Sequence, residues 1–379
     1  MIKFLQGNCI DKIKELDDSS IDCVVSSPPY FGLRDYGTEP QIIGGNKNCN
    51  HIWQTFKRDG NCWGIPNRNI DGQAQTKKTN NSIVKEQEQK KCSKCDAWIG
   101  QLGLEPTYQD YLANTVKVFE TFKPKLKDTA TIWWNVGDSY SSGSRKTTTL
   151  QTVRKPKSNE ISKSKQKYLD GLIVRPAIQT GIKEKDLLMI PNRVAIALQE
   201  SGWYIRSEII WHKPNPMPES IKDRPTSAHE KIWLITKSKK YYYDADAIKE
   251  PVAEATITRL SEKNLKNQKG STRGNGGMKS NGNMKPVGNM ETKNKRNVWT
   301  ITTKPCKEAH FATFPKDLIE PCIKAGCPEG GVVLDPFGGA GTTGIVARSL
   351  NRTAILIELN PEYIEISKNR IDKEFGMFK

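Results

Sequence analysis

Two motifs at opposite ends of the chain constrain its fold most strongly, because each directly follows a run of β-branched apolar residues. The first motif ends the run 21–25 and the second ends the run 332–334; they read Ser26-Ser27-Pro28-Pro29-Tyr30 and Asp335-Pro336-Phe337-Gly338-Gly339-Ala340-Gly341-Thr342-Thr343. Such runs form buried strands of parallel sheets, and open α/β sheets bind ligands at the edge where these strands end. We therefore expect both motifs to lie in one cleft.

Strand-like and helix-like patterns alternate along most of the chain. An opening strand and helix occupy residues 2–16, and further strands are predicted at 21–26, 130–136, 203–211, 231–236, 332–334 and 353–357. Helices are predicted at 107–122, 185–201, 315–325 and 342–350, with a last helix after Glu358. This alternation predicts an α/β fold with a doubly wound, mostly parallel sheet and helices on both faces.

The charge balance indicates a polyanionic partner. The 379 residues include 59 Lys and Arg against 42 Asp and Glu, which gives a formal net charge of +17. This balance favours nucleic acid as a partner, although ribosomal and membrane-surface proteins are basic as well. No apolar run approaches the roughly 18 residues of a membrane span, and the N-terminus lacks the pattern of a signal peptide. We expect a cytoplasmic protein that binds no membrane.

Taken together, the two motifs resemble those of the amino-group DNA methyltransferases, in the permuted order of the beta class. The resemblance implies a Rossmann-like methyltransferase fold, S-adenosylmethionine as the methyl donor and duplex DNA as the substrate. It also implies a bacterial, archaeal or phage origin and a possible cognate restriction endonuclease as partner. By the same resemblance, the target base is held by Ser27, Pro28, Pro29 and Tyr30. S-adenosylmethionine is held by Asp335, Pro336, Phe337, Gly339, Gly341, Thr342, Glu358, His310 and Phe314.

The residues of the first motif suit methyl transfer to an exocyclic amine, whose lone pair is delocalised into the base. The Ser27 side chain and the Pro28 carbonyl can accept the two amino hydrogens, which favours a pyramidal nitrogen that can attack the methyl group. The two prolines stiffen the position of that carbonyl. Tyr30 offers an aromatic face for a base extruded from the duplex, an extrusion that costs a few kcal/mol.

Position 27 bears on which base is modified. In the resembling family, Ser before Pro-Pro-Tyr usually accompanies methylation of cytosine at N4, and Asp or Asn accompanies methylation of adenine at N6. We therefore expect N4-cytosine, with N6-adenine as the alternative. A C5-cytosine enzyme would need a Pro-Cys nucleophile loop, but Pro305-Cys306 and Pro321-Cys322 lack the right context, and these cysteines are interpreted as structural. An RNA or protein methyltransferase and a non-catalytic, zinc-containing DNA-binding protein also stay open.

A polar stretch without hydrophobic periodicity interrupts the α/β pattern and carries two close pairs of metal-binding residues. Cys49 and His51 form one pair, and Cys92 and Cys95 form the other. Four ligands of this kind suit a tetrahedral structural zinc, which would supply folding energy to a segment that lacks an apolar core. Cys62 is a spare ligand. The alternative is that these are incidental thiols in a loop.

These observations divide the chain into four parts. Residues 1–36 and 106–244 form the catalytic half of the methyltransferase domain, and 37–105 is a zinc-binding insertion. By the resemblance to the methyltransferases, residues 245–305 form a target-recognition segment, and 306–379 form the half that binds S-adenosylmethionine. The basic stretches 141–170 and 251–300 have the composition of phosphate-contacting surfaces, and no globular core is expected from the second. His229 and Glu230 come just before a predicted strand, on the loop side of the sheet, and His212 lies at a strand end. Either histidine could face DNA or the base pocket, but a single His is more often structural.

Overall fold

The computed structural model describes most of the chain. The described residues are 1–33, 38–46, 48–56, 89–95, 97–141, 182–255, 257, 291–304 and 313–376. Several sequence predictions lie outside these ranges, namely those for His310, Cys62, Cys306 and the larger parts of both basic stretches.

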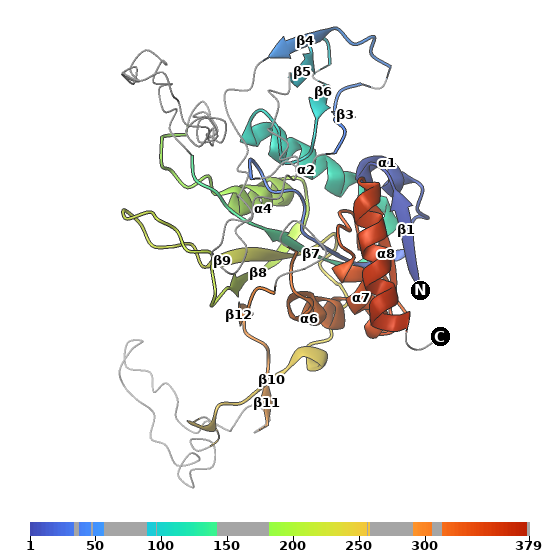
Figure 1. The fold of residues 1–379 in the computed structure, drawn as a ribbon. Coiled ribbons are helices and arrows are strands. Elements are labelled where there is room, and N and C mark those ends of the chain that lie inside the picture. The colour runs from blue at the N-terminus through green and yellow to red at the C-terminus, as the bar shows by residue number, and fades with distance from the viewer. Residues whose placement is uncertain are drawn as a thin grey trace, which may run out of the picture.

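Within the described residues, eight strands form one main sheet (Figure 1); the sequence predicts seven of them, and the strand at 298–300 is additional. Its order is β1 (Ile2–Gln6), β14 (Thr353–Glu358), β13 (Val332–Asp335), β2 (Ile21–Ser26), β7 (Leu126–Val136), β9 (His229–Thr236), β8 (Tyr204–His212) and β12 (Val298–Thr300). Only β9 runs antiparallel to its neighbours β7 and β8; the other pairings are parallel. The prediction of a mostly parallel sheet is therefore confirmed.

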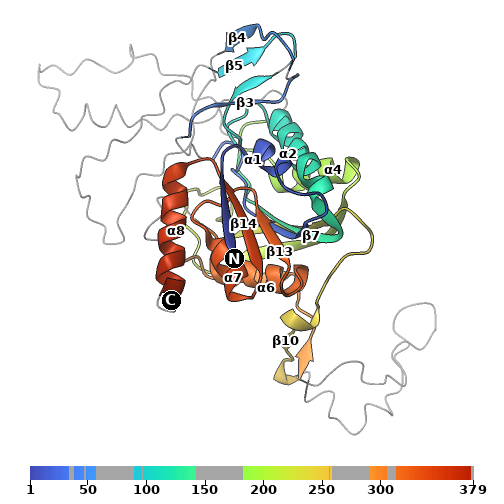
Figure 2. The ribbon, with the colours of Figure 1, turned by 90° about the vertical axis from the view of Figure 1, so that its right-hand side faces the viewer.

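Helices cover both faces of this sheet (Figures 1 and 2). On one face lie α1 (Cys9–Lys14), α2 (Tyr108–Phe122) and α4 (Ile190–Glu200). The other face is covered by α6 (Lys316–Gly326) and α7 (Thr342–Ser349), and α8 (Pro361–Phe375) packs against α7. Short 3-10 helices occur at Lys123–Lys125 and Asp246–Ile248. The doubly wound arrangement matches the sequence prediction.

Strand β7 shows how the sequence produces two separate cores. Successive side chains of a strand point to opposite faces. Trp134 accordingly packs with Phe119 of α2 at 4.9 Å between ring centroids, whereas Trp133 lies in the opposite core, 6.3 Å from the ring of Trp299. Both indoles are fully buried, so β7 is anchored from both sides and holds its carboxyl end in a fixed position.

Helix starts follow local capping, which the sequence predicts at one helix and not at another. The Thr107 hydroxyl accepts a hydrogen bond from the Asp110 amide at 3.1 Å, so α2 begins where the capping box predicts. The helix predicted from residue 185 begins only at Ile190. Met189 has φ of 57°, which stops the helix there, and Asp138 accepts the Ile190 amide at 3.1 Å.

The insertion has its own small sheet, which the sequence analysis did not predict. Its antiparallel order is β3 (Gln41–Ile43), β6 (Trp98–Gly100), β5 (Gln89–Cys92) and β4 (Trp53–Phe56). Ile43, Ala97, Trp98 and Leu104 are buried, so the expectation of a segment without an apolar core is wrong for these residues. We call this four-stranded unit the lobe; it stands above α2 in Figure 1.

The segment predicted to recognise the target is also partly structural. Strands β10 (Glu250–Pro251) and β11 (Thr292–Lys293) pair as a two-stranded ribbon that extends from the main body (Figure 1). Strand β12, in contrast, lies at the edge of the main sheet beside β8, and Trp299 within it is buried. The expectation that residues 251–300 contribute nothing to a core is therefore wrong at Trp299.

Candidate active site

One cavity brings the two sequence motifs together. Strands β2 and β13 are parallel neighbours, so the loops that follow them leave the same edge of the sheet. Ser27 and Pro29 of the first motif line a cavity of about 190 Å³ that is also lined by Phe337 and Gly339 of the second. The prediction that both motifs lie in one cleft is confirmed.

A buried carboxylate joins the two motifs directly. Asp335 is only 1% exposed, and its Oδ1 accepts hydrogen bonds from the Ser26 hydroxyl at 2.6 Å and the Phe337 amide at 3.1 Å. Its Oδ2 accepts the Thr343 hydroxyl at 2.6 Å. Burial raises the pKa of Asp335, while these donors act in the opposite direction. Asp335 lines the cavity, but its carboxylate is engaged in fixing the two loops to each other.

Glu358 fixes the glycine loop from the neighbouring strand β14. Its Oε2 accepts the Gly339 amide at 2.8 Å and its Oε1 accepts the Asn360 amide at 2.8 Å. Burial raises the pKa of this carboxyl, although the two amides lower it. Each carboxylate oxygen can accept a second hydrogen bond. Since Glu358 also lines the cavity, it can receive hydroxyl donors of a ligand there.

Gly341 shapes the loop without lining the cavity, which differs from the sequence prediction. Its φ of 76° favours glycine, and an added Cβ would lie 1.8 Å from the Ser367 hydroxyl oxygen of α8. The other described residues of the predicted cofactor set do line the cavity: Phe314, Asp335, Pro336, Phe337, Gly339, Thr342 and Glu358. Gly341 is therefore a turn residue that lets α8 approach the loop.

Replacing Gly341 by Ala is expected to destabilise the fold by about 1–3 kcal/mol, the usual cost of a strained backbone conformation. The clash with Ser367 forces the loop or α8 to move. Thermal unfolding followed by circular dichroism measures the loss. Gly376→Ala is the matched control, because Gly376 has φ of −70° and open space around its Cβ position. An equal change in both variants would contradict the assigned role.

Several cavity residues were missed by the sequence analysis. Gly7, Asn8 and Cys9 follow β1, and the lobe and its flanks contribute a second group: Thr38, Gln41, Ile43, Gln101 and Leu102. The loop after β1 leaves the same sheet edge as the two motifs, so the rule about strand ends could have identified the first group. No motif marks the second group. The lobe therefore forms part of the wall of this cavity.

The rest of the first motif is held behind the cavity. Pro28 is buried, and the Pro29 carbonyl accepts the Tyr111 hydroxyl at 3.1 Å. The Tyr30 ring packs so closely on Gly137 that an added Cβ there would lie 2.6 Å from it. Neither Pro28 nor Tyr30 lines the cavity, in contrast to Ser27 and Pro29.

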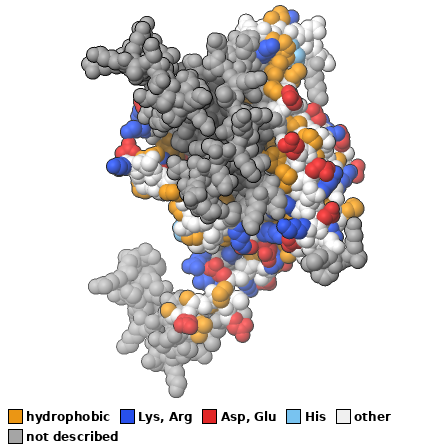
Figure 3. Space-filling model, in the orientation of Figure 1, with side chains coloured by type: hydrophobic (Ala, Val, Ile, Leu, Met, Phe, Trp, Pro, Cys, Tyr) orange, Lys and Arg blue, Asp and Glu red, His pale blue; other side chains and the backbone are white. Residues whose placement is uncertain are grey.

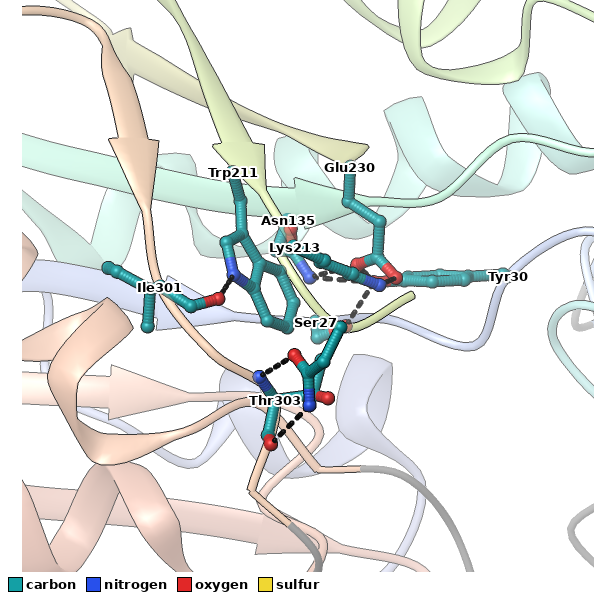
Figure 4. Close-up of polar contacts among 9 residues, drawn as sticks. Ser27, Tyr30, Asn135, Trp211, Lys213, Glu230, Ile301 and Thr303 are labelled. Atoms are coloured by element: carbon teal, nitrogen blue, oxygen red, sulfur yellow. Dashed lines mark hydrogen bonds and ion pairs between the residues drawn. The ribbon is translucent and has the colours of Figure 1, made fainter. Parts of the chain in front are cut away.

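A hydrogen-bond network surrounds the Tyr30 hydroxyl (Figure 4). Tyr30 donates to Glu230 Oε2 at 2.7 Å and accepts the Ser27 hydroxyl at 3.0 Å and the Asn135 amide at 2.6 Å. Asn135 also donates to Glu230 Oε2 at 2.9 Å, and Lys213 forms an ion pair with Glu230 Oε1. Burial raises the pKa of Glu230, but Lys213 and the hydrogen bonds outweigh it and the pKa is lowered. Glu230 is thus an ionised carboxylate behind the first motif.

The loop after β8 is tied to the segment after β12 (Figure 4). The Trp211 indole donates to the Ile301 carbonyl at 2.8 Å, and Asn215 exchanges two hydrogen bonds with the Thr303 backbone. The Lys213 ammonium lies 4.4 Å from the centroid of the Trp211 ring. His212 contacts the Thr300 hydroxyl at 3.1 Å, which agrees with a structural interpretation of this histidine.

The four predicted metal ligands lie together in the lobe. All four ligand atoms of Cys49, His51, Cys92 and Cys95 are within 4.8 Å of one another. The Sγ atoms of Cys49 and Cys92 are 3.9 Å apart, and Cys95 Sγ is 3.3 Å from His51 Nδ1. Tetrahedral zinc, with bonds of about 2.0–2.3 Å, places its ligand atoms at comparable separations. The donor set and its spacing therefore fit a tetrahedral zinc.

The described surface carries charges of both signs. Figure 3 shows Lys and Arg side chains among Asp and Glu over the lower part of the main body. Of the helices within the described ranges, none combines the length and apolar content that crossing a bilayer requires.

Comparisons with known proteins identify the family. The model of the N6_N4_Mtase family, described as DNA methylase, matches residues 21–369. The type II methyltransferase M.Cfr9I of Citrobacter freundii is 36% identical, with 97% of this chain and 87% of that protein aligned. M.SmaI of Serratia marcescens is 35% identical, with 97% and 90% aligned.

A solved structure agrees with this assignment at the level of the fold. The cytosine-N4-specific PvuII DNA methyltransferase superposes with a TM-score of 0.51 at 15% sequence identity, covering 99% of this chain and 91% of that one. The cavity lined by both motifs and the family match over most of the chain lead to one conclusion. This protein belongs to the N6_N4_Mtase family of DNA methylases.

Proposed function

We propose that this protein transfers a methyl group from S-adenosylmethionine to the N4 amine of a cytosine flipped out of duplex DNA. The observation that carries the proposal is the shared cavity. Ser27, which can bind an amine, and the glycine loop, which can bind the methyl donor, line the same space. Near-attack geometry supplies most of the acceleration that such a transfer needs.

The second motif provides the side of the cavity that suits the methyl donor. Glu358 can accept hydrogen bonds from ribose hydroxyls. In nucleotide-binding folds, an acid at the end of the strand that follows the glycine-rich loop has this role. Phe337 and Phe314 offer apolar surface, and Gly339 lets the backbone approach closely. Bound S-adenosylmethionine would supply an activated methyl group on a sulfonium centre.

The first motif provides the side that suits the base. The Ser27 hydroxyl and the Pro28 carbonyl would accept the two amino hydrogens and orient the nitrogen lone pair toward the methyl group. Although Tyr30 does not line the cavity, its ring lies beside Ser27 and would support the flipped base by stacking, a contact worth about 1–3 kcal/mol per base. Gly137 and Glu230 support this tyrosine from behind, so its position is fixed before a base enters.

The choice of cytosine over adenine rests on Ser27. Ser before Pro-Pro-Tyr is typical of N4-cytosine enzymes in the family that the sequence resembles, and the structurally similar PvuII enzyme is cytosine-N4-specific. N6-adenine is the second candidate because the family model covers both amines. As its relatives M.Cfr9I and M.SmaI are type II methyltransferases, we also propose a cognate restriction endonuclease as functional partner.

Radiolabelled S-adenosylmethionine tests this proposal. Purified protein is incubated with unmethylated plasmid DNA, and the DNA is digested to nucleosides and analysed by mass spectrometry. We expect the label in N4-methylcytosine. Label in N6-methyladenine would select the second candidate. Label only in RNA or protein, or in no substrate at all, would contradict methylation of DNA by this chain.

Cofactor affinity is expected to fall as the pH falls, because the ionised Glu358 carboxylate accepts the ribose hydroxyls. Burial raises the pKa of this group above its ordinary value of 4.5. Protonation therefore begins at a higher pH than for an exposed glutamate, and affinity declines through that range. Isothermal titration with S-adenosylmethionine between pH 8 and pH 5 measures the effect. Glu358→Gln should bind more weakly at pH 8 and lose the pH dependence.

We further propose that Cys49, His51, Cys92 and Cys95 hold one structural zinc. The proposal is supported by four soft ligand atoms within 4.8 Å of one another. A site with four protein ligands leaves no open position, so the metal would act through folding rather than chemistry. Elemental analysis should find about one zinc per chain. The variant Cys92→Ser, Cys95→Ser should lose it, and a variant that keeps full zinc would show that the site is elsewhere.

A further inference from the structure

We propose that Glu230, acting through Tyr30, holds the Ser27 hydroxyl as a hydrogen-bond acceptor toward the target amine and receives the proton that methyl transfer releases. This inference rests on the proposed function, since it concerns the same amine and the same cavity. Glu230 is a positioning residue in this scheme, because it reaches the amine only through Tyr30 and Ser27.

The Ser27 hydroxyl has to be oriented so that it accepts a hydrogen bond from the target amine and does not donate one to it. A hydroxyl can donate or accept, whereas the amino group of a base presents two hydrogens and needs acceptors. If Ser27 directed its proton into the cavity, it would oppose the amino hydrogens and could engage the lone pair that must attack. The hydroxyl hydrogen of Ser27 therefore needs a fixed partner on the side away from the base.

The network around Tyr30 fixes that direction. Asn135 Nδ2 lies 2.9 Å from Glu230 Oε2; an ionised carboxylate only accepts, so the amide presents its N–H groups here. The same Nδ2 donates to the Tyr30 oxygen at 2.6 Å. Tyr30 donates its single proton to Glu230 at 2.7 Å. Its remaining acceptor position receives the Ser27 hydroxyl at 3.0 Å, which leaves the Ser27 lone pairs for the cavity.

The charge on Glu230 makes this orientation stable. Lys213 pairs with its Oε1, and both side chains are only 18% exposed. Together with Tyr30 and Asn135, this ammonium lowers the pKa of Glu230 despite its burial. A carboxylate in contact with two donors on one oxygen and an ammonium on the other stays ionised at neutral pH. The Ser27 hydroxyl consequently donates to the Tyr30 oxygen, and the Tyr30 hydroxyl donates to Glu230, along the contacts drawn in Figure 4.

The same chain of contacts can remove the surplus proton. When the amine nitrogen forms its bond to the methyl carbon, the bond from carbon to sulfur breaks and its electron pair stays on sulfur. The methylated nitrogen then carries one proton too many. That proton passes to Ser27 Oγ, the Ser27 proton passes to the Tyr30 oxygen, and the Tyr30 proton passes to Glu230 Oε2. The Ser27 and Tyr30 oxygens each gain one proton and lose one, whereas the Glu230 carboxylate gains a proton and becomes neutral.

Single-turnover methylation of plasmid DNA by Glu230→Gln tests this inference. We expect the rate of methyl transfer to fall about 10²–10⁴-fold, which is the usual contribution of a positioned proton acceptor to the rate of a reaction. Dissociation constants for DNA and S-adenosylmethionine should stay within about threefold, because Glu230 does not line the cavity and its carboxylate is engaged by Tyr30, Asn135 and Lys213. Glu208→Gln is the matched control: this carboxylate on β8 pairs with Lys231, outside the Tyr30 network, and its loss should leave the rate unchanged.

A double-mutant cycle separates the relay from a purely structural role. Tyr30→Phe keeps the ring for stacking but removes the hydroxyl that links Ser27 to Glu230. The relay predicts that Glu230→Gln costs nothing further in the Tyr30→Phe background. Additive losses, a wild-type rate in Glu230→Gln, or a loss confined to DNA affinity would each overturn the inference. Absence of methylation by the wild-type protein would instead overturn the proposed function, so the two failures are distinguishable.

Discussion

Replacing Ser27 by Ala is expected to lower kcat for DNA methylation about 10²–10³-fold, comparable to the loss of one preorganised polar group in other active sites. The side chain lines the cavity and would contact one amino hydrogen of the base. Without this hydrogen-bond acceptor, the lone pair of the amine stays delocalised into the base, and the nitrogen attacks the methyl group more slowly. Steady-state kinetics with radiolabelled S-adenosylmethionine measure the effect.

The loss should be confined to the chemical step. The dissociation constant for S-adenosylmethionine is expected to change less than about threefold, because the glycine loop is held by Asp335 and Glu358 and not by the Ser27 hydroxyl. Ser349→Ala is a matched control, since this exposed serine only bonds the Val346 carbonyl within α7. Full activity in Ser27→Ala would show that the Ser27 hydroxyl does not bind the target amine.

The convergence of the two motifs could be predicted because it depends on a rule that sequence expresses directly. Buried parallel strands read as continuous apolar runs, and their carboxyl ends share one edge. Ser26 and Asp335 therefore meet at 2.6 Å although they come from opposite ends of the chain. The start of α2 was predictable for a similar reason, since Thr107 and Asp110 form a local capping motif.

The sequence places Glu230 just before a strand on the loop side of the sheet, but it does not predict the contact with Tyr30, because that contact depends on the direction of this strand. Strand β9 is antiparallel to β7 and β8, so its beginning lies at the edge where those strands end. Glu230 thereby faces Tyr30, and Lys213 after β8 reaches its carboxylate. Apolar patterning identifies β9 as a buried strand, but it does not reveal which way the strand runs.

The lobe was misjudged for a different reason. Its strands are short, and its buried residues are spread among polar ones, so no periodicity of a useful length develops. Pairing partners such as Ile43 and Trp98 come from distant parts of the insertion. Long-range pairing of this kind is invisible to local patterns. As a result, the sequence suggested a metal site but gave no sign that the surrounding sheet reaches the cavity.

Removal of the proposed zinc is expected to weaken the binding of S-adenosylmethionine about tenfold or more, because the lobe links the four candidate ligands to the cavity. Cys92 lies in β5, and its amide donates to the Ala97 carbonyl at 2.7 Å next to β6. Strand β6 pairs with β3, whose residues Gln41 and Ile43 line the cavity. Loss of the metal should therefore disorder a wall of the cofactor site.

Isothermal titration with S-adenosylmethionine before and after chelation measures this effect, and added zinc should restore the affinity. The variant Cys92→Ser, Cys95→Ser should bind as weakly as the chelated protein and respond to neither treatment. Unfolding of the main sheet should change little, since its two cores are built without the lobe. Unchanged affinity after verified loss of zinc would show that the cavity wall holds its shape without metal.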